Sequence, residues 1–568
     1  MRYSKRYVIF GVILAGALFL KFNTFTAGTE KIENFRGAKL EAETWNPLIA
    51  SSVNDNLLSV MIDNKEYTNE EYSFYMDDNL NIMMPVHILR DALNCSARVY
   101  DGNSLLVEKH SSEIEFPLNQ ETAKVNGKTE EIISPFTKVE DTYYVSLNDL
   151  SNYLDYSYSW NIQENIASAM DMSGNVTIIP SRYDLREKQR VTQVRNQGSY
   201  GTCWAFAALE ALESTLLPEE ENLYSVDHMT LGNGFNISQE EGGEYTMAMA
   251  YLTSWKGPVY DADDPYGDNV TDESLEAVKH VQEVQVIDGK DYEKIKEAVF
   301  KYGGVQTSIY NALRSSLAQS PYYNKAEEAY CYIGTQKPNH DVVIIGWDDS
   351  YPKENFSTDL EGDGAFICQN SWGKEFGKDG VFYISYYDTN IGTHNVVYTR
   401  VDDINNYDHI YQSDLCGWVG QLGYNKDSIY GANVYTAGQT EELVAAGFYA
   451  TGKDSQYELY VVKDFETEKS LENMIPVASG KLNNAGYYTV DFQQKIPVEA
   501  GERYAIVLHM ITPNSVHPMA IEYAADKITK DVILEDGESY ISATGSNWVS
   551  VDTVEESNLC IKAFSNNR

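Results

Sequence analysis

Cysteine is scarce in this chain, with six residues among 568. Small secreted domains that depend on a disulfide framework carry many more cysteines per residue, so this class of protein is excluded. We expect Cys95, Cys331 and Cys368 to be buried thiols, the usual environment of a free cysteine. Cys416 and Cys560 lie at opposite ends of the C-terminal region, and their spacing leaves open whether they are bridged.

Basic residues are also few, since 43 Lys and Arg stand against 85 Asp and Glu, for a formal net charge of -42. Such a charge repels phosphate backbones and argues against a nucleic-acid partner. The carboxylates are spread along the chain, which is typical of a soluble acidic surface. An apolar content of 43% with 12% aromatics excludes general disorder. The length suggests roughly three or four domains.

The chain does not start with an apolar run long enough to span a bilayer easily. Arg2, Lys5 and Arg6 precede the thirteen apolar-rich residues Val8 to Leu20, whereas a membrane span needs about 20. This layout is typical of a secretory signal. No clear cleavage site follows, so residues 1–28 are either a signal peptide or a retained signal anchor. In both cases the rest of the chain lies outside the cytoplasm and meets the membrane only through this segment.

An internal repeat follows a linker at residues 29–58. The segment Met84 to Asp101 matches Val145 to Ile162 at an offset of 61. Each copy predicts a short extended piece, a helix with leucines three or four residues apart, and an alternating strand. Asn126-Gly127 predicts a hairpin turn between the copies.

Residues 59–172, which contain this repeat, resemble the copper amine oxidase-like N-terminal domain of Gram-positive surface proteins. The name does not establish a copper site. The histidines of this region, His87 and His110, stand in unrelated segments. We therefore expect a small α/β repeat domain that acts as a spacer or faces the cell wall.

The stretch "NQGSYGTCWAFAALEAL", Asn196 to Leu212, runs from a glycine-rich loop into a helix. The helix is indicated by an apolar stripe at helical spacing, with Glu210 and Glu213 off it: Phe206, Leu209, Leu212 and Leu216. It is expected to begin at Cys203, where unpaired N–H groups and the positive helix end favour a thiolate. Taken alone, a cysteine in this position is more often structural than catalytic.

Three separated blocks change that interpretation. "IPSRYDLREKQRVTQVRNQGSYGTCWAF" (179–206), "NHDVVIIGW" (339–347) and "GAFICQNSWGKEFGKDGVFYIS" (364–385) are similar, in this order, to blocks of the papain-like cysteine peptidases. His340 follows Cys203 by 137 residues and Asn370 follows His340 by 30, spacings that fit this family. The resemblance implies a two-lobed papain-like domain over residues 173–403.

The resemblance also implies a role for each matching residue. Cys203 is the nucleophile, and His340 takes the thiol proton and returns it to the leaving amine. Asn370 orients the imidazole through its side-chain carbonyl. The Gln197 amide and the Cys203 backbone N–H donate to the developing oxyanion. Trp372 shields the hydrogen bond between His340 and Asn370 from water and is also expected among the substrate-binding residues.

Four further positions match the family's substrate-binding residues. Gly242 and Gly243 match the glycines along which the substrate backbone pairs as an extended strand. Glu244 and Tyr245 occupy positions that line the family's S2 pocket. Their polarity suggests a basic or polar side chain at P2 of the substrate, the second residue before the cleaved bond.

The chain departs from the family pattern in two places. Tyr200 stands where the family has a cysteine, Thr202 replaces Ser or Ala, and Glu240-Glu241 precede the glycine pair without a partner cysteine. In the family the two missing cysteines form a disulfide. Its absence here removes a source of stability and does not affect the expected catalytic residues. An inserted acidic segment, Asp348 to Gly364, is expected to be a solvated loop, with calcium binding as the alternative.

From residue 404 to the end, short alternating runs are separated by Gly, Asn and Asp turns, which predicts an antiparallel β-sandwich. Examples are "ELVAAGFYATG", "YELYVVKDF", "GYYTVDF" and "RYAIVLHM". The region resembles the lectin-like domain that follows the peptidase domain in some clostridial surface cysteine peptidases. The resemblance implies contact with a glycan or a cell-wall polymer.

These patterns together predict a multidomain α+β protein, with a small α/β repeat domain, a central papain-like fold and a C-terminal β-sandwich. We expect an extracytoplasmic cysteine endopeptidase, secreted or anchored at the cell surface, that acts on proteins or peptides without a cofactor or metal. Two alternatives stay open. One is a surface adhesin or wall-binding protein, and the other is a transpeptidase that passes the same acyl-enzyme to an amine.

Overall fold

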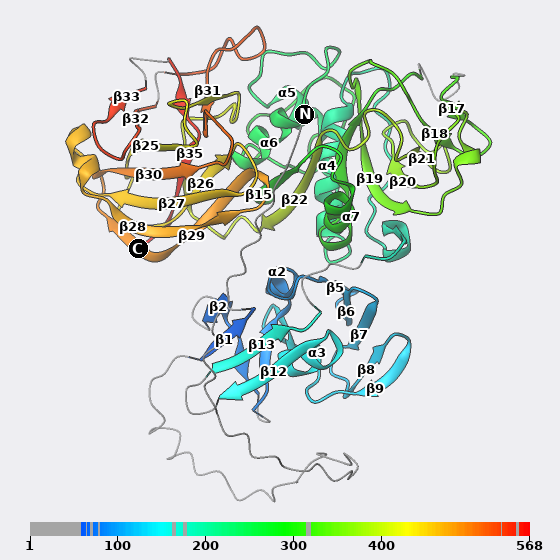
Figure 1. Cartoon of the computed structure of the whole chain (residues 1–568). Coiled ribbons are helices and arrows are strands. Elements are labelled where there is room, and N and C mark those ends of the chain that lie inside the picture. The colour runs from blue at the N-terminus through cyan, green and yellow to red at the C-terminus, as the bar shows by residue number, and fades with distance from the viewer. Residues whose placement is uncertain are drawn as a thin grey trace, which may run out of the picture. The chain divides into compact units, whose positions relative to one another are not determined.

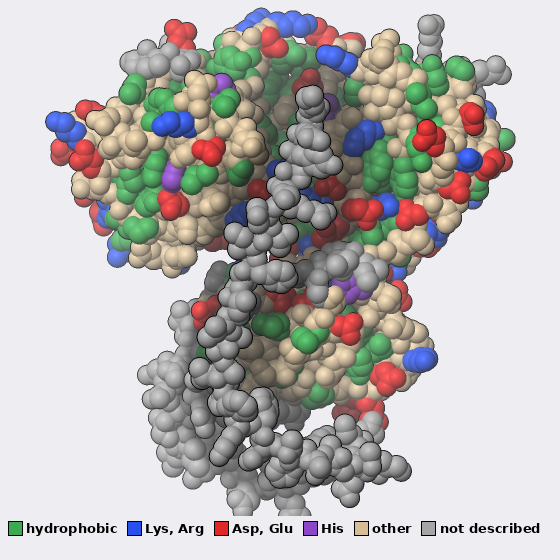
Figure 2. Space-filling view, viewed as in Figure 1, with side chains coloured by type: hydrophobic (Ala, Val, Ile, Leu, Met, Phe, Trp, Pro, Cys, Tyr) green, Lys and Arg blue, Asp and Glu red, His purple; other side chains and the backbone are tan. Residues whose placement is uncertain are grey.

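A computed structural model of the chain describes residues 58–568, except 64, 69–71, 78–79, 162–165, 174–178, 314–319, 535–536 and 552–555. The leader expected at 1–28 and nearly all of the linker expected at 29–58 therefore lie outside the described residues. Within the described part, no helix is both long enough and apolar enough to cross a bilayer. Acidic side chains are scattered over the face shown in Figure 2 and form no single patch there.

The internal repeat forms two copies of a strand–helix–strand unit, as predicted. In the first copy, β4 (Ile82–Pro85) leads through η1 (Val86–Ile88) and α2 (Leu89–Leu93) to β5 (Ser96–Tyr100). In the second, β11 (Thr142–Ser146) leads through α3 (Leu147–Tyr153) to β12 (Tyr156–Asn161). The leucines of both helices are buried in one core, and β4 pairs with β11, so the copies meet along their first strands.

The predicted hairpin turn is also present between β8 (Thr122–Val125) and β9 (Lys128–Glu131). Asn126 and Gly127 have φ angles of 50° and 77°. Two successive positive φ angles are what a type I′ turn requires, and Asn-Gly is the pair that adopts them most easily.

The central region has a helical part and a β-rich part. The helical part holds α4 (Cys203–Leu216), α5 (Val226–Leu231) and α6 (Tyr245–Thr253). The β-rich part holds β16 (Val305–Ile309), β19 (His340–Asp348), β20 (Ala365–Gln369), β21 (Val381–Ser385) and β22 (Asn395–Asp402), with α7 (Tyr292–Lys301) packed on β19. In Figure 1, α4 runs alongside β19, and the two elements are in contact. This two-part arrangement confirms the papain-like fold.

The C-terminal region is the expected antiparallel sandwich. The four quoted sequence runs form β26 (Glu441–Ala450), β27 (Ser455–Val462), β29 (Ala485–Val498) and β30 (Arg503–Ile511). One sheet contains β28 (Ile475–Leu482), β27, β30 and β25 (Ser428–Thr436), and the other contains β29, β26 and β35 (Ile561–Asn567). Apolar side chains from both sheets, among them Phe448, Leu459 and Ile561, fill one core between them.

One sheet runs without a break from the central region into the sandwich, which the sequence patterns did not indicate. β15 (His280–Ile287) pairs with β22 on one side and with β29 on the other, within a 13-stranded sheet. Figure 1 shows β15 between these two strands. The register places Glu283 opposite Tyr488 and Gln285 opposite Gly486. The sandwich is therefore joined to the central region by backbone hydrogen bonds as well as by side-chain contacts.

The acidic segment Asp348 to Gly364 exposes five of its six acidic residues, as expected of a solvated loop, but it also buries apolar side chains. Tyr351, Phe356 and Leu360 are buried in a small apolar cluster. Its Asp349 carboxylate accepts a hydrogen bond of 2.8 Å from the Lys296 ammonium. The apolar residues that lie between the carboxylates in the sequence are numerous enough to form this small core.

All six cysteines are free thiols. Cys95, Cys331 and Cys368 are buried, as predicted. Cys416 and Cys560 are buried as well, and the bridge considered for them is not formed. The Cys560 thiol instead lies 3.2 Å from the carbonyl oxygen of Gly417.

Candidate active site

Cys203 is the first residue of α4, where the sequence pattern placed it. The carbonyl of Thr202 accepts hydrogen bonds from the N–H groups of Ala205 and Phe206 at 3.0 and 3.1 Å. The Thr202 hydroxyl bonds to the hydroxyl of Tyr266 at 2.8 Å and does not cap the helix. The positive end of α4 therefore lies at Cys203 without a side-chain cap to neutralise it.

His340 and Asn370 are brought together by two neighbouring strands. His340 begins β19, Asn370 directly follows β20, and these strands pair antiparallel. The imidazole Nε2 lies 2.8 Å from the Asn370 side-chain carbonyl, so this nitrogen donates and Nδ1 is the acceptor of the neutral ring. The Trp372 ring lies 5.3 Å from the imidazole ring, centroid to centroid, at a tilt of 43°. The Trp372 ring is therefore close enough to help exclude water from the hydrogen bond between His340 and Asn370.

Gln197 is fixed against the same segment. Its backbone N–H donates to the carbonyl of Ser371 at 2.8 Å, and the Ser371 hydroxyl donates to the Gln197 side-chain oxygen at 2.7 Å. The side-chain nitrogen donates to the carbonyl of Tyr200 at 2.7 Å, which occupies one of its two hydrogens. Gln197 is not among the residues that line the cavity of Cys203 and His340. Ser371 was missed by the sequence analysis, although it stands inside the recognised Asn-Ser-Trp-Gly block.

Cys203 and His340 line one cavity of about 660 Å³. Its wall also contains the four residues expected to bind substrate, Gly242, Gly243, Glu244 and Tyr245. Gly243 packs so closely that a Cβ there would lie 2.4 Å from the indole of Trp204. Trp372 is not in this lining, so this residue, expected among the substrate contacts, touches His340 instead.

Four polar residues of the cavity wall were missed: Ser308, Lys337, Asp341 and His394. Asp341 follows His340 in an otherwise apolar strand, and this break in the pattern is the signal that could have identified it. Its carboxylate accepts a hydrogen bond of 2.8 Å from the side chain of Gln306. Burial raises the Asp341 pKa, while hydrogen bonds from Ser308 and Gln306 oppose the shift.

Burial governs the protonation of the two reacting groups. Burial, reinforced by the Asp341 carboxylate, raises the pKa of the Cys203 thiol to about 12. Burial lowers the pKa of the His340 imidazole to about 4, against the opposing effect of its hydrogen bond with Asn370. Taken separately, each shift favours the uncharged form of its group, whereas the helix end favours the thiolate. Transfer of a proton from the Cys203 thiol to the His340 imidazole creates two opposite charges at once. Their mutual attraction offsets part of the cost of burying each charge.

A buried charge cluster supports α4 from behind. Glu210 and Glu213, which lie off the predicted apolar stripe, are only 2% and 1% exposed. Arg195 donates to Glu213 at 3.1 Å, and Gln369 donates to Glu210 at 3.1 Å. Burial raises the pKa of Glu210 to about 7, with Arg195 opposing the shift. Because the Arg195 carbonyl accepts from the N–H of Gly373 at 2.9 Å, the cluster links α4, the Gln197 loop and the Trp372 segment.

Hydrogen bonds hold the loop before Cys203 in the place where the family has a disulfide. The N–H of Gly201 donates to the carbonyl of Gln239 at 2.7 Å. The Tyr200 hydroxyl accepts from the side chain of Asn269 at 2.9 Å. The loop before Cys203 is thus tied to the segment that precedes the glycine pair without a covalent bond.

Three family profiles match separate parts of the chain. The profile described as papain family cysteine protease matches residues 179–400, the copper amine oxidase N-terminal domain matches 43–168, and the lectin-like domain matches 410–565. These are the three families that the sequence motifs resemble.

Curated relatives match the central region. Cathepsin S of Rattus norvegicus is 32% identical over 232 residues, which is 38% of this chain and 63% of the relative. Cathepsin S of Mus musculus is 32% identical over 218 residues, 36% of this chain and 57% of the relative. The chain thus spans about 57–63% of the length of these two relatives.

Two solved structures match the central and C-terminal regions together. The clostridial cysteine protease Cwp84 after propeptide cleavage has a TM-score of 0.61 and 26% identity, over 68% of this chain and 100% of that one. The cysteine protease and lectin-like domains of Cwp84, a surface layer associated protein of Clostridium difficile, have a TM-score of 0.60 and 25% identity, over 70% and 92% of the two chains.

Proposed function

Because residues 179–400 form a papain-family cysteine peptidase domain, we propose that the whole chain is an extracytoplasmic cysteine endopeptidase that works through Cys203, His340 and Asn370. The observation that carries the proposal is the 2.8 Å hydrogen bond between His340 and Asn370, at a cavity that His340 shares with a cysteine on a helix N-terminus. Protein or peptide chains are the proposed substrates.

In the proposed reaction, the Cys203 thiol proton passes to His340 and the sulfur attacks the scissile carbonyl carbon. The resulting oxyanion accepts hydrogen bonds from the Gln197 amide and the Cys203 N–H. The C–N bond breaks as His340 returns the proton to the leaving amine, and a thioester remains. A water molecule that gives a proton to His340 then hydrolyses the thioester, and the proton returns to sulfur.

Covalent labelling tests this assignment. An epoxide that alkylates thiolates is expected to modify Cys203 of the full chain, because His340 can accept its proton on demand. The adduct is mapped by mass spectrometry, and peptide cleavage is assayed in the parent and in Cys203→Ala. Cys331 and Cys368 serve as internal controls, since both are buried and burial raises their pKa values. An adduct on either of these, with cleavage retained in Cys203→Ala, contradicts the proposal.

We further propose a preference for a basic side chain at P2. Four carboxyl groups stand in the cavity wall, those of Glu240, Glu241, Glu244 and Asp341, against one Lys or Arg among the described lining residues, Lys337. The match to the family's S2 pocket rests on Glu244 and Tyr245. Peptides with Arg at P2 are expected to have at least about tenfold higher kcat/KM than peptides with Glu at P2.

Glu244→Gln is expected to reduce this ratio. A matched control is Glu472→Gln, which removes an exposed carboxylate from η4 (Glu468–Glu472) in the C-terminal region. A ratio that is equal in the parent and in Glu244→Gln means that other residues set the preference at P2.

The proposed location is the cell surface or the medium. Support comes from the signal-like start of the sequence and from the description of Cwp84 as surface layer associated. The lectin-like match supports a glycan or cell-wall polymer as a second partner. A surface adhesin or wall-binding protein, in which the peptidase domain is secondary, and a transpeptidase stay as alternatives. Product masses with and without an added amine separate hydrolysis from transfer.

A further inference from the structure

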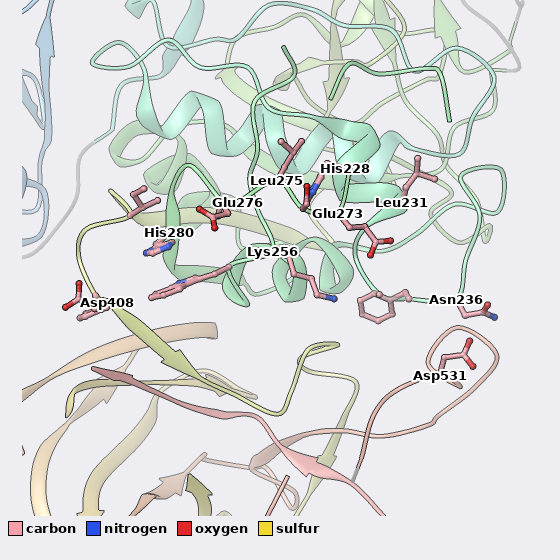
Figure 3. Close-up of a pocket in the computed structure, with 18 residues that line it drawn as sticks. His228, Leu231, Asn236, Lys256, Glu273, Leu275, Glu276, His280, Asp408 and Asp531 are labelled. Carbon is pink, nitrogen blue, oxygen red and sulfur yellow. The ribbon is translucent and has the colours of Figure 1, made fainter. Parts of the chain in front are cut away.

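A second cavity, of about 810 Å³, lies between the central region and the C-terminal region (Figure 3). Its wall combines the end of α5 and the segment after it, the end of α6, residues 273–280, residues 404–408 and Asp531. It shares no lining residue with the cavity that contains Cys203. Its volume is in the range of small-molecule binding sites, about 300–1,000 Å³.

Two buried side-chain nitrogens of this cavity make no hydrogen bond within the described residues. His228 is 3% exposed; its Nδ1 lies 2.6 Å from the Tyr251 hydroxyl, whereas its Nε2 has no partner. The indole Nε1 of Trp255 is also buried without a partner. Burial lowers the His228 pKa, with Asp264 and the backbone of Asp272 opposing. The Asp272 backbone already faces the His228 imidazole, so the Trp255 nitrogen is the one that points to a ligand, since buried N–H groups are rarely left unsatisfied.

The mouth of the cavity is acidic. Four exposed carboxylates line it: Glu273, Glu276, Asp408 and Asp531. Among the described lining residues, Lys256 is the one Lys or Arg, and its ammonium already donates to the carbonyl of Asn233 at 2.9 Å. An excess of carboxylates disfavours phosphate, sulfate and uronate groups. The aromatic rings of Phe235 and Tyr407 add apolar surface to the wall.

We propose that this cavity binds a neutral oligosaccharide of about two or three sugar residues. A sugar hydroxyl can accept from the Trp255 N–H and can donate to the carboxylates at the mouth. The apolar face of a sugar ring can pack on an aromatic side chain such as Phe235. The inference gives a site to the glycan partner proposed above and does not depend on the peptidase chemistry. It places the saccharide at the junction of two regions, with much of the wall supplied by the peptidase region.

Calorimetric titration of the full chain tests the site with four probes. They are cellobiose, N,N′-diacetylchitobiose, a disaccharide of the same size that carries a uronate, and trilysine. At least one neutral disaccharide is expected to bind, and the uronate disaccharide is expected to bind at least tenfold more weakly. Trp255→Phe keeps an aromatic ring and removes the N–H, and a tenfold loss of affinity is expected.

The rim variant Glu273→Gln/Glu276→Gln changes only exposed side chains, so it tests the site even if Trp255→Phe fails to fold. It is expected to weaken binding at least fivefold, whereas Glu472→Gln leaves binding unchanged. Trilysine binding without disaccharide binding, binding of neither disaccharide, or disaccharide binding that survives in the pocket variants overturns the inference. Peptide cleavage is measured in the same preparations. Lost saccharide binding with intact cleavage refutes only this site, and lost cleavage with intact binding refutes only the proposed peptidase.

Discussion

A variant with His340 replaced by alanine is expected to cleave peptides with a kcat/KM about 10⁴-fold below that of the parent chain, or lower. In the proposed reaction His340 both accepts the thiol proton and returns it to the leaving amine, and no other imidazole in the described residues bonds to Asn370. Asn370→Ala is expected to lose less, because the imidazole keeps both nitrogens and loses only its orientation. Initial rates with a fluorogenic peptide measure both effects.

The pH dependence of alkylation separates loss of the base from general damage. In the parent, the thiolate forms by proton transfer to His340, so the alkylation rate is expected to be nearly flat between the His340 pKa of about 4 and the Cys203 pKa of about 12. Below about pH 4 the imidazole is already protonated and the rate falls. In His340→Ala the proton must leave to solvent, so the rate rises about tenfold per pH unit through the neutral range. Equal slopes in parent and variant contradict the role of His340 as the base.

The candidate catalytic residues could be proposed from the sequence because each stands in a contiguous motif. The glycine-rich loop before Cys203 and the strand that begins at His340 are local features of the sequence. The resemblance to a family of known fold predicts that they lie close together. The repeat helices and the strands of the sandwich were predictable for a similar reason, since each depends on a local period of apolar residues.

The supporting contacts could not be predicted in this way. Glu210 is charged, and residue type alone places it at the surface; its burial depends on Gln369, which follows it by 159 residues. The cavity at Trp255 is completed by Asp531, from the far end of the chain. The pairing of β15 with β29 joins residues about 200 positions apart, and an alternating pattern identifies a strand without identifying its neighbour. Each of these features depends on long-range partners.

Replacement of Gly486 by alanine is expected to destabilise the chain by at least about 3 kcal/mol, because two costs combine. Gly486 lies between Gln285 on β15 and Ala450 on β26. Its φ of +141° is one that L residues rarely adopt, and a Cβ there would lie 2.0 Å from the carbonyl oxygen of Val284. The backbone of β15 must shift away from β29 to accept the methyl group. Thermal unfolding of the full chain, followed by circular dichroism, measures the loss.

Gly501→Ala is the matched control, because Gly501 also has a positive φ, +82°, but a Cβ there would have no atom within 4 Å. Its cost is backbone strain alone, about 1 kcal/mol, so the difference between the variants isolates the contact of β29 with β15. β15 pairs with β22, β22 with β16, and β16 with β19, which begins at His340. Peptide cleavage in Gly486→Ala is therefore expected to fall at the lower temperature at which this variant unfolds. If both variants unfold together, the continuous sheet does not hold the two regions to each other, and the sandwich is attached chiefly by side-chain contacts.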